Sequence, residues 1–456
     1  MSNFRFYAAM AAGKLSTAVL RAAGRNATHT PGKLAVSICP DFIGHIKKPD
    51  LLVCVTGTNG KTTVSNLMTN ALKSAGYDVI NNSYGSNIQA GLACVLLQNS
   101  SFSGKTKKSA AVLEVDERSS LKFYPYMKPD LIIVNNIMRD SLKRNAHTDF
   151  ISFIINSGVP EGVPVVLNAD DIICSQLLPQ SGDRTYFGVD AEIPAESPKT
   201  ARDIVYCPKC GGRLRADWIR YNHIGRFHCE DCDFRSPERD FTVTDIDREN
   251  DTFTVSCGSG ELKFRLPNDN ITNVYNFCAV TAALTRLGIS ADTIAEAFGG
   301  ANIVKTRFQE LKAGRANVTM ILAKGQNPVA CSRVYNYVAS LPGDNKCVLV
   351  CVDDVGDNIR NSESTCWLYD ADYTPFADPA IKKLIFAGKR RFDHILRCRM
   401  SGVDTSKIET AEKVEGFSDL LEPDKFDDIY ILYDNYLLDV ANAEAEKLVR
   451  KGGAAK

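Results

Sequence analysis

The stretch that most constrains this chain is residues 51–67, which read LLVCVTGTNGKTTVSNL. An apolar run ends in a glycine-containing turn, and an amphipathic segment begins at Lys61, an order that predicts a strand, a loop and a helix start. Gly57 and Gly60 let backbone N–H groups approach a polyphosphate, and the helix start adds partial positive charge. The sequence therefore predicts a phosphate-binding loop, in which Lys61 reaches the outer phosphates and the Thr62 hydroxyl holds Mg²⁺.

Composition limits the partners of the chain. Its 456 residues are enough for two or three domains. The 54 basic and 54 acidic residues give a formal net charge of zero, so bulk attraction to nucleic acid or to an anionic membrane is not expected. Lys14, Arg21 and Arg25 interrupt the apolar N-terminal stretch, so a signal peptide is not expected, and no run is long enough for a transmembrane segment.

Fifteen cysteines could suggest disulfides, but most stand singly inside apolar segments. These single cysteines include Cys54, Cys94, Cys174, Cys278, Cys347 and Cys351. We expect them to be buried, reduced thiols of a cytosolic protein.

Strand and helix patterns alternate from about residue 49 onward. A helix expected over 64–75 is followed by strand patterns at 77–81, 110–115, 131–135 and 164–167. This order favours an α/β fold with a parallel sheet, and the polar residues that follow the later strands lie where such a sheet binds ligands. Residues 1–46 are expected to form a helical lead-in with a turn at Thr30–Gly32.

A second alternation of strand and helix starts after residue 307. Its strand patterns fall at 318–323, 347–352, 383–387 and 428–433, after short β-structure at 252–264 and a helix over 272–299. We therefore predict a central nucleotide-binding domain over 47–305 and a second α/β domain over 306–456.

The segment at about 200–240 interrupts the central domain and carries a metal pattern. Two CxxC knuckles are separated by 18 residues, and their cysteines are Cys207, Cys210, Cys229 and Cys232. This spacing is typical of a zinc ribbon, and four thiolates leave no open position on a tetrahedral ion, so the site is expected to be structural. His223 and His228 could replace a ligand, but the regular cysteine spacing favours surface or packing roles for them.

Three carboxylates follow the strand pattern that begins at residue 110. They are Glu114, Asp116 and Glu117, and acids beside a phosphate loop suit Mg²⁺. Glu114 is the preferred ligand. Asp116 and Glu117 could equally be a solvated strand end, and all three could be surface charge.

The form TGTNGKTT at residues 56–63 is typical of the Mur ligase superfamily, ATP-dependent enzymes that join a carboxylate to an amine. It departs from the wider loop pattern at Val55, where that pattern has glycine. The chain as a whole resembles the MurT family, Mur ligase relatives with a zinc ribbon inserted in a Mur ligase-type central domain. The motifs that carry this resemblance are TGTNGKTT, LEVDE at 113–117, NNIMRDSLKR at 135–144, LNADD at 167–171, the two knuckles and VYNFCAVTAALTRLGI at 274–289.

The resemblance implies roles for individual residues. By motif, the ATP-binding residues are Gly57, Thr58, Asn59, Gly60, Lys61, Thr62, Thr63, Asn276, Arg307 and Lys324. Glu114 would complete the Mg²⁺ site with Thr62. Asn276, expected near the adenine, could instead cap or pack a helix start, and Arg307 or Lys324 could be ordinary surface charges.

The C-terminal region departs from the family pattern. MurT proteins carry a stretch like ADGRDxSWxWD, in which an aspartate completes the catalytic triad of a glutaminase partner. Here Ser364 stands at that position, whereas Trp367 and Asp370 match the end of the stretch. Asp357 and Glu363 are the nearby acids, so Asp357, Glu363 and Asp370 are the catalytic candidates.

The resemblance implies an amidation reaction. ATP would phosphorylate the α-carboxylate of D-glutamate in the lipid II stem peptide, and ammonia would attack the acyl phosphate to give D-isoglutamine. Cys257 in SCGSG lacks the leading glycine of a GxCxG-type nucleophile turn. Ammonia is therefore expected from a glutamine amidotransferase subunit, the family's GatD, in a heterodimer that works in the cytoplasm at the inner face of the membrane.

Two other functions stay open. One is a Mur-type ligase that adds an amino acid to a carboxylate, as folylpolyglutamate synthase and the muramyl ligases do, and the altered 353–370 loop keeps it possible. The other is a nucleotide-binding scaffold that docks through its zinc ribbon. The presence of Lys61, Thr62 and Glu114 disfavours the scaffold, since a non-catalytic protein does not need a Mg²⁺ site.

Overall fold

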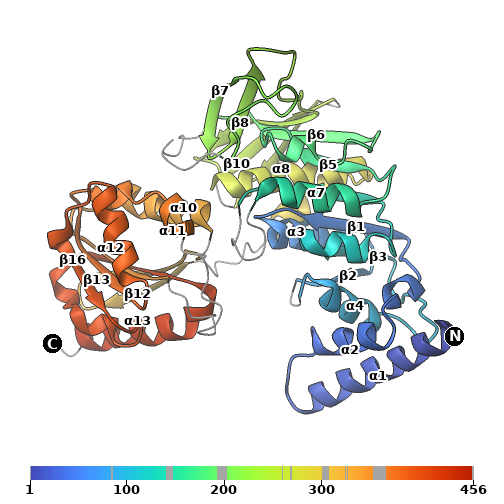
Figure 1. The fold of residues 1–456 in the computed structure, drawn as a ribbon, viewed down its shortest axis with the longest axis horizontal. Helices are drawn as coiled ribbons and strands as arrows, with labels where there is room; N and C mark the ends of the chain where they lie inside the picture. Colours follow the sequence, from blue (N-terminus) through green and yellow to red (C-terminus); the bar gives the residue numbers. More distant parts are fainter. Residues whose placement is uncertain are drawn as a thin grey trace.

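Two sheets, each covered by helices on both faces, organise the chain (Figure 1). The structure is a computed structural model. It describes residues 2–83, 86–139, 147–192, 203–258, 260–267, 270–299, 308–323, 325, 327–352 and 366–453. Within this part of the chain, no helix combines the length and apolar character that a membrane crossing requires.

The lead-in consists of two helices, α1 (Ser2–Ala22) and α2 (Thr30–Ile38). The expected turn at Thr30–Gly32 is wrong, because these residues form the first turn of α2, with Pro31 at a position where a missing N–H costs nothing. Gly32 is required by packing rather than by a turn: a Cβ atom there would lie 1.9 Å from the carbonyl oxygen of Ala90 in α4 (Gln89–Gln98). Helices α2 and α4 therefore approach each other closely, and this contact holds the lead-in on the sheet.

The larger sheet has nine strands in the order β11-β10-β9-β6-β5-β4-β1-β3-β2. Their bounds are β1 Leu51–Thr56, β2 Val79–Asn81, β3 Ala110–Glu114, β4 Leu131–Val134, β5 Val165–Asn168, β6 Arg184–Val189, β9 Phe241–Asp247, β10 Thr252–Cys257 and β11 Gly260–Arg265. Pairing is parallel from β2 to β9 and antiparallel from β9 to β11. The predicted parallel α/β sheet is confirmed, and β6 extends it beyond the strands expected from the sequence.

Strand β1 is buried on both of its faces. Val53 and Val55 belong to a core that includes residues of α3 (Lys61–Ser74), whereas Leu52 and Cys54 belong to a core that includes residues of α4 (Gln89–Gln98). Successive strand residues point to opposite faces, so the uninterrupted apolar run fits a strand between two helical layers. The remaining helices of these layers are α5 Ser120–Phe123, α7 Thr148–Gly158, α8 Ile271–Arg286 and α9 Ala291–Gly299.

Strand order reverses at β1, which pairs with β3 on one side and with β4 on the other. In open α/β sheets, ligands bind outside the carboxyl ends of the strands at such a point. The residues that follow β1, β3 and β4 are therefore the first place to look for a functional site.

The helix expected over 272–299 is two helices, α8 and α9, so this expectation is wrong in its extent. Gly288 has a φ of 75° and follows the last turn of α8. A left-handed glycine just past a helix end is a common terminator, because it lets the final carbonyl groups find partners.

The segment predicted to be a zinc ribbon, at about 200–240, contains a two-stranded antiparallel hairpin of β7 (Leu214–Tyr221) and β8 (Ile224–Cys229), at the top of Figure 1. It lies between β6 and β9 in the chain, which agrees with the expected insert. The hairpin is not part of the nine-stranded sheet.

The C-terminal part is a six-stranded sheet in the order β12-β13-β17-β14-β15-β16. Its elements are β12 Phe308–Ala313, β13 Ala316–Leu322, α10 Pro328–Ser340, β14 Lys346–Cys351, α11 Cys366–Asp370, β15 Ile381–Ala387, α12 Arg391–Met400, β16 Ile408–Ala411, β17 Asp428–Tyr433 and α13 Leu438–Gly453. All pairs are parallel except β12 with β13. The four predicted strands of a second α/β unit are confirmed.

The predicted burial of the single cysteines is also confirmed. All fifteen cysteines are described without a disulfide, and the six single cysteines named from the sequence are buried. Burial raises the pKa of Cys278 to about 12, so this thiol stays protonated and packs as an apolar side chain.

Helix α13 is tied to the C-terminal sheet by the buried carboxylate of Glu444, which accepts hydrogen bonds from the backbone N–H groups of Gly416 and Ser418. Glu444→Ala removes the acceptor of the buried Ser418 N–H and of the half-buried Gly416 N–H, and we expect a loss of about 2–4 kcal/mol in the free energy of unfolding. Burial opposes ionisation of Glu444, but Lys447 and the hydrogen bonds outweigh it and hold the pKa below its usual value. The contribution is therefore present above the unfolded pKa of about 4.5 and is lost as the pH falls through the lower folded value.

Urea unfolding of Glu444→Ala at pH 7 and at pH 4 measures this effect. Glu446→Ala on the same helix is the matched control, since Glu446 is largely exposed. Equal stabilities of the two variants at pH 7 would contradict the anchoring role.

Candidate functional site

The loop between β1 and α3 lies at the carboxyl end of β1, where the strand order reverses. Gly57 and Gly60 have φ angles of 120° and 85°, a region that favours glycine. A Cβ atom on Gly57 would lie 2.8 Å from the carbonyl oxygen of Asn136. Both glycines are therefore required by the backbone path, which turns sharply and enters α3 at Lys61.

Residues that follow β4 hold this loop. Thr58 N–H donates to the Asn136 carbonyl at 2.8 Å, and Asn59 N–H donates to the Asn136 Oδ1 atom at 2.9 Å. The Thr58 hydroxyl exchanges two hydrogen bonds with the backbone of Met138, at 2.9 and 3.1 Å. The loop is thus fixed from its β4 side by residues 136–138.

Lys61 is surrounded by acidic groups. Its Nζ atom lies 2.9 Å from Glu117 Oε1 and also contacts the carbonyl oxygen of Gly57. Burial lowers the pKa of Lys61, but the carboxylates of Glu117, Glu114 and Asp116 outweigh it and raise the pKa above its usual value. The ammonium group is therefore charged at neutral pH and lies inside the loop, where an anionic ligand would meet it.

Thr62 and Glu114 form the predicted pair. The Thr62 hydroxyl donates to Glu114 Oε2 at 2.7 Å, and the other carboxylate oxygen accepts from Asn87 Nδ2 at 2.9 Å. Asn82 fixes the backbone of Glu114 with two hydrogen bonds of 2.8 and 2.9 Å. Hydroxyl and carboxylate oxygens are the ligands that Mg²⁺ prefers, so this pair fits that ion.

The alternative that the acids after β3 are solvated is wrong. Glu114, Asp116 and Glu117 are all buried, with exposed fractions of 8%, 5% and 3%. They have separate contacts, since Asp116 accepts the N–H of Arg118 and Glu117 pairs with Lys61. Glu117 is thus a site residue that sequence reasoning left as possible surface charge.

Asn276 lies beside the loop. It is 2% exposed in α8, and its Oδ1 atom is so close to Gly60 that a Cβ atom there would approach it to 2.2 Å. The alternative of a helix cap is wrong, because Asn270 caps α8 through Thr272 N–H. Arg307 and Lys324 lie outside the described residues.

The four knuckle cysteines converge at the base of the β7–β8 hairpin. Their sulfur atoms all lie within 4.8 Å of one another, with 3.7 Å between Cys207 and Cys232 and 3.6 Å between Cys210 and Cys229. Backbone N–H groups point at these sulfurs, for example Gly212 at Cys210 over 3.3 Å. Four thiols with N–H donors fit a closed tetrahedral zinc site.

The histidines between the knuckles differ from each other. His228 is half-exposed beside Asp217, as a surface residue should be. His223 is fully buried between Asp171 and Asp203, so neither histidine lies in the thiol cluster and His223 is not a surface residue. A histidine at a hairpin turn gives no sequence signal of such a pair of carboxylates.

The C-terminal candidates are only partly described. Asp357 and Glu363 lie outside the described residues. Asp370, at the end of α11, accepts a hydrogen bond of 2.9 Å from Arg139 Nη1, which follows β4 in the other sheet. Cys257 ends β10 in an antiparallel hairpin rather than in a strand-to-helix turn, so it lacks the setting of an activated nucleophile.

Comparisons with known proteins agree with this geometry. The family model described as Mur ligase middle domain matches residues 55–204, and the one described as MurT ligase C-terminal matches residues 324–436. The chain is 29% identical over 406 residues to the lipid II isoglutaminyl synthase (glutamine-hydrolyzing) subunit MurT of Staphylococcus aureus strain COL, which covers 89% of this chain and 90% of that protein. The protein with the same description from Streptococcus pneumoniae is 28% identical and covers 94% of both chains.

Solved structures share the fold. A pseudomurein peptide ligase type C from Methanothermus fervidus matches with a TM-score of 0.65 at 22% identity, over 90% of this chain and 81% of that one. MurF ligase from Thermotoga maritima in complex with ADP matches with a TM-score of 0.59 at 14% identity, over 94% of this chain and 85% of that one. The chain thus combines a match to the Mur ligase middle domain with a match to the MurT ligase C-terminal domain, and it is similar to MurT subunits over about nine-tenths of its length.

Proposed function

We propose that this chain is an ATP-dependent carbon–nitrogen ligase that amidates the α-carboxylate of D-glutamate in the stem peptide of lipid II, a step of peptidoglycan synthesis. The observation that carries the proposal is the joint presence of Lys61, Thr62 and Glu114 in one loop site with near full-length similarity to MurT subunits. The name of those relatives supplies the substrate class and the product.

The proposed reaction has two steps. A carboxylate oxygen of the substrate attacks the γ-phosphorus of ATP, ADP leaves, and an acyl phosphate forms. Ammonia then attacks the acyl carbon, phosphate leaves, and the amide of D-isoglutamine remains. Positioning and charge neutralisation by Lys61 and Mg²⁺ would support the first step.

The residues proposed to hold ATP are those of the loop, Gly57, Thr58, Asn59, Gly60, Lys61, Thr62 and Thr63, together with Asn276, Arg307 and Lys324. Thr62 and Glu114 would ligate Mg²⁺. The left-handed glycines support this assignment because they open the loop to a polyphosphate, and Asn276 is supported by its contact distance to Gly60.

Ammonia is proposed to come from a glutaminase subunit of the GatD type in a heterodimer. The word subunit in the names of the relatives supports a complex, and the hairpin setting of Cys257 supports a separate nucleophile. Asp370 is already paired with Arg139, which favours Asp357 or Glu363 as the acid offered to a partner's triad. The lipid-linked substrate places the proposed work in the cytoplasm at the inner membrane face.

The proposed domains are residues 1–46, 47–305 with the ribbon at about 200–240, and 306–456. The separation of the two sheets in the chain supports the second boundary. The proposed metal of the ribbon is one structural Zn²⁺.

The function predicts ADP release with Mg²⁺ and a lipid II that contains D-glutamate. We expect the purified chain to turn over with ammonium but not with glutamine, because its sequence contains no GxCxG-type nucleophile pattern. Coupled assays of ADP with mass spectrometry of the lipid product measure this. Turnover with an amino acid instead of ammonium would favour the rival amino-acid ligase, and nucleotide binding without any ADP formation would favour the scaffold.

Lys61→Ala is expected to lower this turnover by about 10²-fold or more, since it removes the cation of the phosphate loop. Lys73→Ala, at the exposed end of the same helix, is the matched control and should keep wild-type turnover. Because Lys61→Ala leaves Glu117 buried without its cation, thermal unfolding of both variants is compared, and Lys61→Arg retains the charge. Turnover of Lys61→Ala within threefold of wild type would remove this residue from the mechanism.

The ribbon is expected to carry about one zinc ion per chain, since four thiolates complete one tetrahedral site. Cys229→Ser should lose the metal, whereas Cys257→Ser, outside the cluster, should retain it. Elemental analysis of the purified proteins measures both. A structural zinc would be excluded if the purified wild-type protein contained no metal and a chelator left its unfolding temperature unchanged.

A further inference from the structure

The tip of the ribbon hairpin is clamped to the central sheet, next to the turn after β5. Gly225 N–H donates to the Asp170 carbonyl at 2.7 Å, and Ile224 forms an isolated antiparallel bridge with Asp171. Between the two hairpin strands, Asn222 has a φ of 46°, so the turn is tight. The hairpin therefore inserts its tip rather than standing free in solvent.

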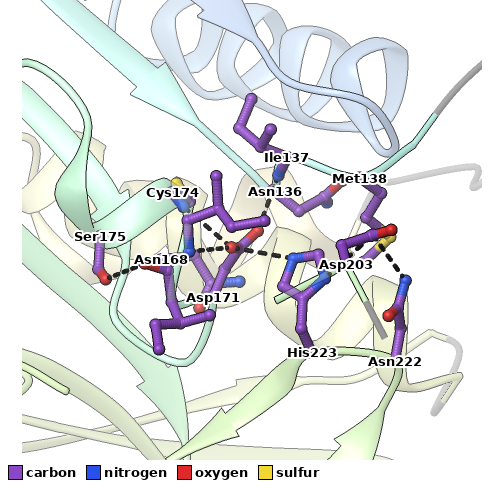
Figure 2. A network of polar contacts seen from close by, with 12 residues as sticks. Asn136, Ile137, Met138, Asn168, Asp171, Cys174, Ser175, Asp203, Asn222 and His223 are labelled. Atoms are coloured by element: carbon purple, nitrogen blue, oxygen red, sulfur yellow. Dashed lines mark hydrogen bonds and ion pairs between the residues drawn. The ribbon is translucent and has the colours of Figure 1, made fainter. Parts of the chain in front are cut away.

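His223 at this tip is buried between two carboxylates (Figure 2). Its Nε2 atom lies 3.2 Å from Asp171 Oδ1, and its Nδ1 atom lies 3.2 Å from Asp203 Oδ2. Neither contact has the alignment of a hydrogen bond, so both are ion pairs. Burial lowers the pKa of His223, but the two carboxylates outweigh it and raise the pKa to about 10. The imidazolium supplies the cation that both buried acids require.

Asp171 continues the contacts to the phosphate loop. Its Oδ2 atom accepts the Ile137 N–H at 2.7 Å, as Figure 2 shows. The next residue, Met138, exchanges two hydrogen bonds with the Thr58 hydroxyl. The carboxylate of Asp171, which pairs with His223, is therefore hydrogen-bonded directly to residues 136–138, the segment that fixes the phosphate loop.

Asp203 continues the contacts in the opposite direction. Arg139 lies with its Nε atom 2.5 Å from Asp203 Oδ1 and its Nη1 atom 2.9 Å from Asp370 Oδ2. Charges thus alternate along Asp171, His223, Asp203, Arg139 and Asp370. The series starts beside the phosphate loop, passes through the ribbon and ends on α11 of the C-terminal sheet.

We propose that His223 is a positioning residue for nucleotide binding, which holds residues 136–139 in place against both the phosphate loop and Asp370. The ribbon thereby links the position of the C-terminal sheet to the conformation of the phosphate loop. The inference rests on the proposed function only in that the loop binds ATP. Arg139 belongs to the same linkage, because it follows Met138 directly and carries the ion pair to Asp370.

The test is the affinity for a non-hydrolysable ATP analogue with Mg²⁺, measured by calorimetry without acceptor. We expect His223→Gln to weaken binding about fivefold or more, the lower end of common coupling effects, with zinc content unchanged. His228→Gln is the matched control in the same hairpin, since His228 is half-exposed and pairs with Asp217, which is not part of this series. Wild-type affinity in His223→Gln would overturn the inference.

Arg139→Gln keeps the test decisive if His223→Gln fails to fold, because Arg139 is partly exposed and lies outside the hairpin. We expect it to weaken nucleotide binding too, and the double variant to lose less than the product of the two single effects, since both residues act through Asp203. Independent effects that multiply would overturn the linkage. If the wild-type chain itself binds no nucleotide, the proposed function fails; if it binds and the variants match it, only this inference fails.

Discussion

The parallel pairing of β1 between β3 and β4 is the constraint on which the rest of the site depends. Parallel strands end at the same edge of a sheet, so the residues that follow β1, β3 and β4 meet there. Residues 57–60 form the loop, residues 114–117 contribute the three carboxylates, and residues 135–139 contribute two asparagine amides and Arg139. None of these segments could form the site alone, because backbone N–H groups of the loop donate hydrogen bonds to the segment after β4.

Buried charge is the second feature that organises the molecule. Lys61 lies among carboxylates, and His223 lies between Asp171 and Asp203. A buried ion is stable only where an opposite charge compensates its lost hydration, so each of these groups restricts its neighbours. The same logic extends through Arg139 to Asp370, where an ion pair joins the two sheets. Function and architecture are thus connected by compensation of charge rather than by apolar packing alone.

Much of the fold could be predicted from periodicity. The apolar strands β1, β3, β4 and β5 were clear because strands buried on both faces read as continuous apolar runs. The end of α8 is not evident from the sequence because Leu287 and Ile289 continue the mostly apolar pattern of residues 274–286 across Gly288, and Thr30–Gly32 predicts a turn because it consists of turn-forming residues. Local composition cannot separate a helix start that contains proline from a turn when packing against α4 decides between them.

The sequence by itself determined the glycine-containing loop after β1 and the four-cysteine cluster, because each depends on residue types at short, fixed spacings. Glycines at 57 and 60 and paired cysteines act through local backbone geometry, which a linear pattern records. Only the tertiary structure decided that Glu117 pairs with Lys61, that His223 is buried between two acids and that Asp370 contacts Arg139. These contacts join residues far apart in the chain, and burial, which sets their charge states, is a property of the packed molecule rather than of any segment.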